Sequence, residues 1–395
     1  DECGHDFGSH GNLTCLQPTK KGYPKMIKEV VPIEDLVKTA IKEAISKRLG
    51  AEAATAGFAE DGEATAEAIP AATTEPIKLV LKPGQVMASK LFKQFRMAKR
   101  DFPISVFKPE DWDVRIRDFI PEVDPTYVLD KEHTIHILKS WEAKEKVLVY
   151  GPTGAGKSSL IEQLCANVGR PFIRVNCSGD MDSSMIFGQQ AARDGATYWV
   201  DGSVTEAVKY GAVFAWDEWD VTPPEITMGL QWLLEKNGKL FLKEMPGTSK
   251  EKFIVPHDCF RIVALGNTQG QGDDTGVHSG TNVQNSATVD RFDTAIRIGY
   301  MEESVETDMI MGKHPTMVPD YVKGLVKFAN LIRQGYTTGQ LGLTMSPRAL
   351  LSICSKLASG YNLIESVELV YANKLNESHQ KVAKELFRKI YGTSK

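Results

Sequence analysis

The sequence lacks a long hydrophobic run, and this absence is the first constraint on what the protein can be. No apolar stretch approaches the roughly 18–20 residues that a helix needs to cross a bilayer. The first thirty residues are polar, so we do not expect a secretory signal peptide. Cysteine is scarce, and Cys165, Cys177, Cys259 and Cys354 are scattered through predicted helices and strands. Such cysteines are typical of buried thiols in a reducing compartment, so we expect a cytoplasmic protein.

The chain also lacks a strong excess of charge. With 47 Lys and Arg against 51 Asp and Glu, the formal net charge is -4, which gives no global attraction to nucleic acid or an anionic membrane. Residues 51–76 contain six acidic residues and no Lys or Arg. Their Ala-, Thr- and Glu-rich composition cannot bury enough apolar surface to offset the entropy of ordering, so we expect a flexible acidic linker. A marginal alanine-rich helix is the alternative.

The regions on the two sides of this linker differ in their pattern of apolar and charged residues. Residues 1–50 are an N-terminal region, in which apolar residues at three- and four-residue spacing between 33 and 49 predict one amphipathic helix. Residues 77–115 are a basic linking segment. Basic and aromatic positions are interleaved between 90 and 100, and a solvated helix face is favoured there over a surface that binds nucleic acid.

The rest of the chain predicts an α/β fold followed by helices. Residues 116–305 alternate short apolar runs with helical stretches, which indicates a parallel sheet covered by helices on both faces. Residues 306–395 carry no strand pattern and predict a C-terminal lid of four or five helices. The predicted strands are 147–150, 172–176, 212–216, 261–265 and 295–298.

A glycine-rich segment beginning at Gly151 fits the phosphate-binding pattern G-x-x-x-x-G-K-[ST] at every fixed position, between a predicted strand and a predicted helix. Glycines let the backbone approach a polyphosphate closely, and the helix start supplies unpaired N–H groups. We therefore predict ATP binding, with Lys157 reaching the β- and γ-phosphates and Ser158 ligating Mg²⁺. A structural glycine-rich turn is the alternative. The predicted phosphate loop consists of Gly151, Pro152, Thr153, Gly154, Ala155, Gly156, Lys157, Ser158 and Ser159.

Two further predicted strands end in polar side chains that suit hydrolysis of a γ-phosphate. Asp217 and Glu218 follow an apolar strand, the first placed to hold Mg²⁺ and the second to polarise an attacking water. Asn267 follows the next strand. Because the carboxyl ends of parallel strands lie along one edge of a sheet, we expect Asn267 beside the two acids, orienting water or a γ-oxygen. A helix cap for the acids and a turn for the asparagine are the alternatives.

Two arginines complete a pattern that resembles the AAA+ ATPases. The phosphate loop, the acid pair, Asn267, Arg291 and Arg348 occur in the order and spacing of that family. Within it the chain resembles the MoxR-like and chelatase branch, and more closely the CobS-type ATPase subunits of aerobic cobaltochelatase. The stretches that carry the closer resemblance are 121–127, 156–158 with 161–163, 238–240, 270–276 and 280–285 leading into 290–292.

The resemblance implies a fold and an assembly. We expect a five-stranded AAA+ core with a helical lid, and two inserted hairpins, one within 187–202 and one between 239–243 and 253–256, directed toward partners or a ring pore. Arg291 would reach the ATP of a neighbouring subunit, so a homo-oligomeric ring, expected to be a hexamer, is implied. Arg348 would be a sensor arginine on the lid, with action in cis or in trans left open.

The resemblance also implies a function. ATP hydrolysis would power insertion of cobalt into a tetrapyrrole by a partner chelatase subunit in cobalamin biosynthesis, with an adaptor subunit linking the two. One alternative is a MoxR-like chaperone that remodels another protein. Others are a motor acting on nucleic acid, which is less favoured, and a nucleotide-gated scaffold without turnover.

One cluster near the N-terminus has a separate interpretation. Cys3, His5, His10 and Cys15 supply four soft ligands within thirteen residues, the number that tetrahedral zinc takes. Their spacing fits none of the common finger patterns well. A structural zinc site is therefore one hypothesis and an irregular tail is the other.

Overall fold

The computed structural model describes residues 16–18, 24–26, 82, 84–95, 101–270, 272 and 283–392. The chain divides into two units, Asp1–Pro76 and Ile77–Lys395. In the first unit, strand β1 (Leu16–Pro18) pairs antiparallel with β2 (Pro24–Met26). The predicted amphipathic helix, the acidic linker and the zinc hypothesis at Cys3, His5, His10 and Cys15 fall outside the described residues.

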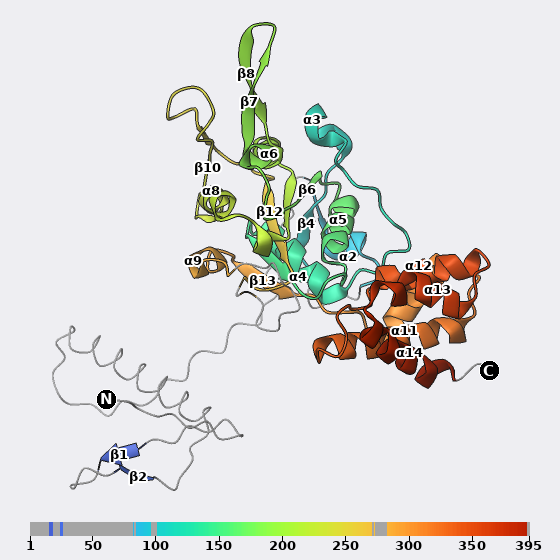
Figure 1. The fold of residues 1–395 in the computed structure, drawn as a ribbon. Helices are drawn as coiled ribbons and strands as arrows, with labels where there is room; N and C mark the ends of the chain where they lie inside the picture. Colours follow the sequence, from blue (N-terminus) through green and yellow to red (C-terminus); the bar gives the residue numbers. More distant parts are fainter. Residues whose placement is uncertain are drawn as a thin grey trace, which may run out of the picture. The chain divides into compact units, whose positions relative to one another are not determined.

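A five-stranded parallel sheet forms the centre of the second unit (Figure 1). Its strand order is β13–β5–β12–β9–β6, so the first strand of the sheet in sequence lies between the last two. Each predicted strand is present, with ends that differ from the prediction by no more than one residue. The strands are β5 (Val147–Tyr150), β6 (Phe172–Asn176), β9 (Val213–Asp217), β12 (Arg261–Gly266) and β13 (Thr294–Arg297).

Helices cover both faces of this sheet, which explains why its strands are apolar at successive positions. On β9, Val213 and Ala215 belong to one hydrophobic cluster, and Phe214 and Trp216 belong to another. The first cluster includes residues of α4 (Lys131–Glu142) and α5 (Lys157–Val168). The second includes residues of α7 (Ser203–Tyr210) and α8 (Pro224–Leu234).

A short β–α–β segment ahead of the sheet packs against the same core. Its buried residues Ala88, Phe92 and Ile104 join the first cluster, and Ser105 donates its backbone N–H to Glu142 Oε1 at 2.7 Å. Lys90 is exposed. The elements are β3 (Gln85–Met87), α2 (Ala88–Leu91) and β4 (Pro103–Ser105), followed by η1 (Pro109–Asp111) and α3 (Val114–Arg117).

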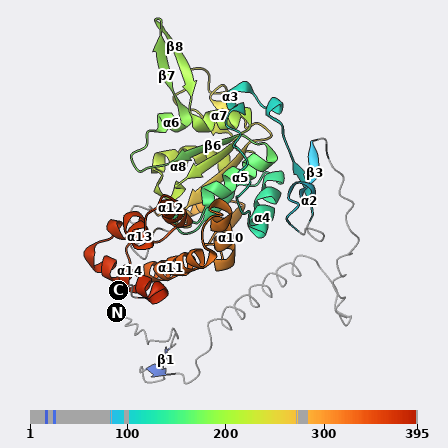
Figure 2. The same ribbon diagram turned by 90° about the vertical axis from the view of Figure 1, so that its right-hand side faces the viewer.

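Both predicted hairpins are present. The first follows α6 (Ser183–Phe187) and projects away from the core in both views (Figures 1 and 2). The second is short and follows α8. The strands of the first hairpin are β7 (Gly188–Arg193) and β8 (Ala196–Asp201), and those of the second are β10 (Leu240–Phe241) and β11 (Phe253–Ile254). Two short helices connect the larger elements, η2 (Trp219–Val221) and α9 (Ser286–Val289).

The described part of the C-terminal region is a lid of α-helices with its own hydrophobic core, as predicted. Buried residues such as Leu325, Phe328 and Ile353 form that core. The lid elements are α10 (Glu303–Lys313), α11 (Pro319–Thr337), α12 (Pro347–Ala358), α13 (Leu363–Val370), η3 (Ala372–Lys374) and α14 (Glu377–Tyr391). Among the described helices, none combines the length and the hydropathy of a membrane span.

Candidate nucleotide-binding site

The site lies where the loops after three neighbouring strands meet. Parallel pairing sets Gly266 beside Tyr150 and Leu265 beside Asp217, so β5, β12 and β9 end at the same edge of the sheet. A cavity of about 610 Å³ opens there, lined by the phosphate loop, the acid pair, Asn267 and residues of the lid. This is the edge at which open parallel sheets bind ligands.

At three glycines, the phosphate loop has a backbone conformation that other residues rarely adopt, and at two of them another segment also approaches closely. Gly154 has φ +74°, and a Cβ there would lie 2.4 Å from Ser346 Cβ in the lid. Gly151 has φ +152°, and a Cβ there would lie 1.9 Å from the carbonyl oxygen of Ile298. These glycines therefore allow both the turn and the close approach of two other segments.

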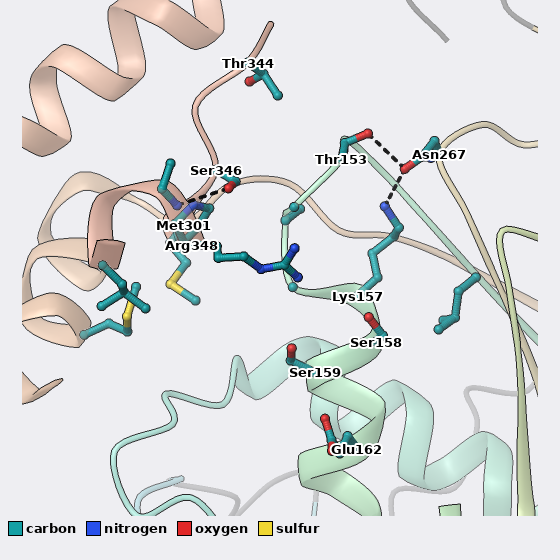
Figure 3. A pocket seen from close by; sticks show the side chains of 18 of the residues that line it. Thr153, Lys157, Ser158, Ser159, Glu162, Asn267, Met301, Thr344, Ser346 and Arg348 are labelled. Atoms are coloured by element: carbon teal, nitrogen blue, oxygen red, sulfur yellow. Dashed lines mark hydrogen bonds between the residues drawn. The ribbon is translucent and has the colours of Figure 1, made fainter. Parts of the chain in front are cut away.

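Lys157 holds this loop together through its ammonium group (Figure 3). Its Nζ donates to the backbone oxygens of Gly151 (2.8 Å) and Pro152 (3.1 Å) and to Asn267 Oδ1 (3.0 Å). Thr153 Oγ1 donates to the same Asn267 oxygen at 3.3 Å. Burial lowers the pKa of Lys157, and the nearby carboxylates oppose that change. Asn267 thus lines the cavity at the shared edge of the sheet, with its side-chain oxygen directed to the loop.

The two acids at the end of β9 have different surroundings. Asp217 is buried, and its Oδ2 accepts from Arg174 Nε at 2.7 Å and lies 2.6 Å from Arg174 Nη2. Glu218 is half-buried and has a left-handed backbone with φ +53°, a conformation that is costly for a residue other than glycine. Burial raises the pKa of Glu218, and Asp217 and Asp220 raise it further. Glu218 is therefore a more basic carboxylate than a solvent-exposed one.

Two residues of this site were missed by the sequence analysis. Arg174 is the charged centre of a mainly apolar strand, β6, and that break in the pattern was the available signal. Asp220 is fully buried, and its Oδ2 accepts from the backbone N–H groups of Asn267 (3.0 Å) and Thr268 (2.8 Å). The same oxygen accepts from the Thr268 hydroxyl at 3.0 Å. Asp220 therefore fixes the segment that carries Asn267, a role that no local pattern revealed.

The two predicted arginines occupy different places. Arg348 is in the first turn of α12, lines the cavity, and extends toward the phosphate loop (Figure 3). Arg291 follows α9 and is not among the residues that line the cavity. Its Nε donates to Glu235 Oε1 at 2.7 Å, and its Nη1 donates to the carbonyl of Ala287. Within one chain, the structure thus brings Arg348 to the phosphate loop but leaves Arg291 outside the cavity.

The donors and acceptors of the cavity suit a magnesium nucleotide. Backbone N–H groups at the start of α5 and the Lys157 ammonium suit phosphate oxygens, and the Ser158 hydroxyl and Asp217 carboxylate are hard oxygen ligands of the kind Mg²⁺ takes. Mg²⁺ in such sites has few protein ligands and takes others from phosphate and water. Among the described residues there is no group of three or more His, Cys, Asp or Glu that would hold a metal without a nucleotide.

Comparison with known families agrees with this geometry. Residues 146–292 match the model of the AAA domain of the dynein-related subfamily. This segment is an AAA domain. It contains the phosphate loop, both acids, Asn267 and Arg291, and only Arg348 lies beyond it. The resemblance stated from the sequence is therefore confirmed at the level of the domain.

Three curated proteins illustrate the similarity. The chain is 29% identical to the aerobic cobaltochelatase subunit CobS of a Sinorhizobium species over 282 residues, 69% of this chain and 83% of CobS. It is 27% identical to protein NorQ of Paracoccus denitrificans over 256 residues, 65% of this chain and 89% of NorQ. It is 31% identical to midasin of Dictyostelium discoideum over 196 residues, which is 49% of this chain but 3% of midasin.

Proposed function

We propose that the protein is an ATP-hydrolysing AAA+ motor whose reaction takes place in the cavity at the ends of β5, β9 and β12. The observation that carries this proposal is the convergence of the phosphate loop, Asp217, Glu218 and Asn267 on one cavity. The loop is sufficient for phosphate binding, whereas Asp217, Glu218 and Asn267 suit activation of water beside a bound phosphate.

Each part of the cavity has a role in this proposal. The loop N–H groups and Lys157 bind the β- and γ-phosphates, and Lys157 exchanges its present oxygen partners for phosphate oxygens of higher charge. Ser158 and Asp217 would hold Mg²⁺, which would neutralise charge on the phosphates. Arg174, which contacts Oδ2 of Asp217, also lines the cavity and is available to bind phosphate.

Glu218 is the proposed general base. It accepts a proton from water as the water oxygen bonds to the γ-phosphorus and the bond from that phosphorus to the bridging oxygen breaks, giving ADP and phosphate. Asn267 orients the water or a γ-oxygen. Arg348 approaches from the lid and stabilises negative charge that develops on the γ-phosphoryl group.

Arg291 is proposed to act on a neighbouring subunit. It lies outside the cavity of its own chain and sits in the AAA domain after α9. A head-to-tail contact would place Arg291 at the next chain's γ-phosphate, and when the rotation between subunits closes, it forms a ring, proposed to be a hexamer.

The similarity to CobS supports a more specific role. The ring would drive insertion of cobalt into a tetrapyrrole by a partner chelatase subunit, converting ATP hydrolysis into movement of that partner. The similarity to NorQ, at comparable coverage, favours a second candidate, the remodelling of a different protein. A pull-down that recovers a large chelatase subunit in an ATP-dependent manner would support the first role, and recovery of another protein in its place would support the second.

The hydrolysis proposal predicts the behaviour of one conservative substitution. Glu218→Gln retains the size and hydrogen bonding of the side chain but cannot accept the proton, so turnover is expected to fall by about 10²-fold or more. ATP affinity, measured with a fluorescent analogue, is expected to stay within a few-fold of wild type. Glu225→Gln, at an exposed acid on α8, is the matched control and should retain full turnover. Unchanged turnover in the Glu218 variant would remove that residue from its assigned role.

A further inference from the structure

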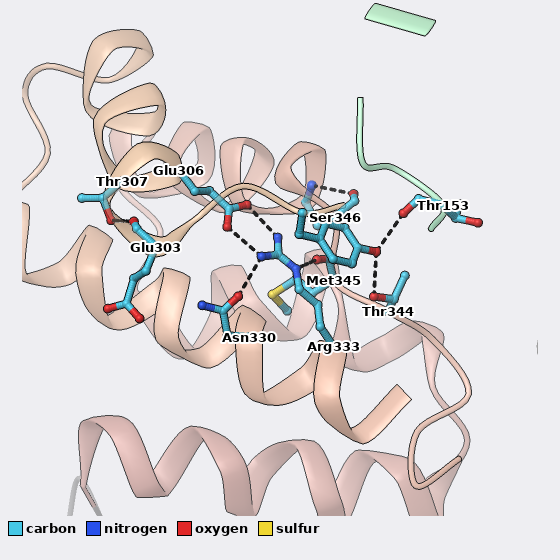
Figure 4. A network of polar contacts seen from close by, with 11 residues as sticks. Thr153, Glu303, Glu306, Thr307, Asn330, Arg333, Thr344, Met345 and Ser346 are labelled. Carbon is cyan, nitrogen blue, oxygen red and sulfur yellow. Dashed lines mark hydrogen bonds and ion pairs between the residues drawn. The ribbon is translucent and has the colours of Figure 1, made fainter. Parts of the chain in front are cut away.

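A second polar network joins the lid to the phosphate loop (Figure 4). Tyr300 follows β13, and its hydroxyl donates to the backbone oxygen of Thr153 at 2.9 Å. The same hydroxyl lies 3.0 Å from Thr344 Oγ1, which can donate to it. Burial raises the pKa of Tyr300, so the phenol keeps the proton that it donates. The middle of the phosphate loop is thus hydrogen-bonded to a residue in the segment that connects β13 to the first lid helix, α10.

Arg333 of α11 packs its guanidinium over the ring of Tyr300. Its guanidinium lies 4.1 Å from the centre of the Tyr300 ring, a cation–π distance. Two parallel bonds join Arg333 to the fully buried Glu306, at 2.7 Å from Nη1 and 2.6 Å from Nη2. Nη1 also donates to Asn330 Oδ1 at 2.9 Å. A buried ion pair of this kind adds little net stability, because desolvation opposes the attraction, but it fixes geometry.

The same guanidinium also holds the segment that leads to Arg348. Arg333 Nε donates to the backbone oxygen of Met345 at 2.8 Å, and the next residue, Ser346, is the N-cap of α12. Ser346 in turn lies against Gly154 of the phosphate loop. Arg333 therefore contacts both Tyr300, which is bonded to Thr153, and the backbone segment that leads to Arg348.

We propose that Tyr300, Arg333 and Glu306 are positioning residues that set the phosphate loop and Arg348 at a fixed separation. None of the three lines the cavity, so each acts through the loop or through α12. The inference rests on the proposed hydrolysis site, because it concerns how Arg348 reaches a γ-phosphate there. Movement of the lid would change this separation, and the network would make the rate of hydrolysis depend on lid position.

The sharpest test removes one hydroxyl. Tyr300→Phe keeps the ring on Arg333 but loses the bond to Thr153, and we expect kcat to fall roughly 3- to 10-fold, the effect of one hydrogen bond. Tyr391→Phe is the matched control, since it removes a similar bond, 3.1 Å to the Tyr321 carbonyl, elsewhere in the lid. That control should leave kcat unchanged, and both variants should keep the wild-type melting temperature within a few degrees.

A double-mutant cycle separates positioning from structure. If Tyr300 acts through Arg348, the Tyr300→Phe effect on kcat should disappear in an Arg348→Ala background, because the group being aimed is gone. Equal effects of Tyr300→Phe in both backgrounds, or no effect in either, would overturn the proposal. If Arg348→Ala itself leaves kcat unchanged while Glu218→Gln abolishes turnover, this inference fails and the hydrolysis site stands.

The buried pair provides a second variant. Replacing it by apolar residues, Arg333→Met with Glu306→Leu, is expected to leave the lid folded, because buried ion pairs are often replaced without loss of stability. We expect kcat to fall about tenfold or more with little change in ATP affinity, since the hold on both Tyr300 and α12 is lost. A folded double variant with wild-type kcat would contradict the coupling.

Discussion

At the scale of single residues, the site is governed by charged side chains that already have partners within the chain. Lys157 is bonded to Asn267 and the loop, and Asp217 is bonded to Arg174. Nucleotide binding in the proposed mechanism therefore exchanges partners rather than recruiting free charges. Glu218 differs, because burial and neighbouring carboxylates raise its pKa while Arg174 and Lys157 lower it.

This balance predicts a pH effect for Arg174. Glu218 must be deprotonated to act as a base, so activity falls as pH drops through its pKa. Arg174→Met removes a positive charge that lowers that pKa, and the acid limb of the kcat/KM profile is expected to move to higher pH. Arg193→Met, at an exposed site on β7, is the control and should leave the limb in place. If the acid limb of the Arg174→Met profile stays at the wild-type pH, the Arg174 charge does not lower the pKa of Glu218.

At the scale of secondary-structure elements, the sheet was predictable because its three central strands, β5, β9 and β12, are buried on both faces and are mostly apolar. The phosphate loop was predictable from its glycine-rich pattern, and the placement of Asn267 was predictable because strand ends in a parallel sheet share an edge. The segment β3–α2–β4 was not recognised as part of the core, because its elements are three or four residues long and show no clear periodicity. Asp220 and the Tyr300–Arg333 network depend on contacts between distant segments, which no local pattern carries, whereas Arg174 was marked only by a charge within the apolar pattern of β6.

One such contact, between η2 and the end of β12, makes a prediction of its own. Asp220→Ala leaves the backbone N–H groups of Asn267 and Thr268 without their acceptor, at a cost of about 1–3 kcal/mol for a buried donor. The melting temperature should drop and turnover should fall further than the loss of folded protein explains, because Asn267 is displaced. Asp220→Asn keeps one acceptor oxygen, so its melting temperature and turnover should lie between those of the wild type and of Asp220→Ala. Wild-type turnover in a folded Asp220→Ala variant would contradict this role.

At the scale of the whole molecule, a single cavity gathers every part of the proposed reaction except one. The loop, the acids, Asn267 and Arg348 gather in one cavity of the second unit, whereas Arg291 is held by Glu235 outside it. A single chain would then have an incomplete site. The proposed ring completes it, and hydrolysis becomes a property of the interface between subunits, where the lid, the neighbouring chain and a bound partner can all influence the rate.

Complementation between two inactive variants tests this claim most directly. Glu218→Gln chains keep Arg291, and Arg291→Ala chains keep Glu218, so a site that pairs the two variants in the right order is complete. In an equal mixture about a quarter of interfaces would be complete in a closed ring, and the account predicts that ATP turnover reappears although each variant alone is inactive. A mixture that assembles but remains as inactive as its parents would contradict it, as would full activity of Arg291→Ala alone.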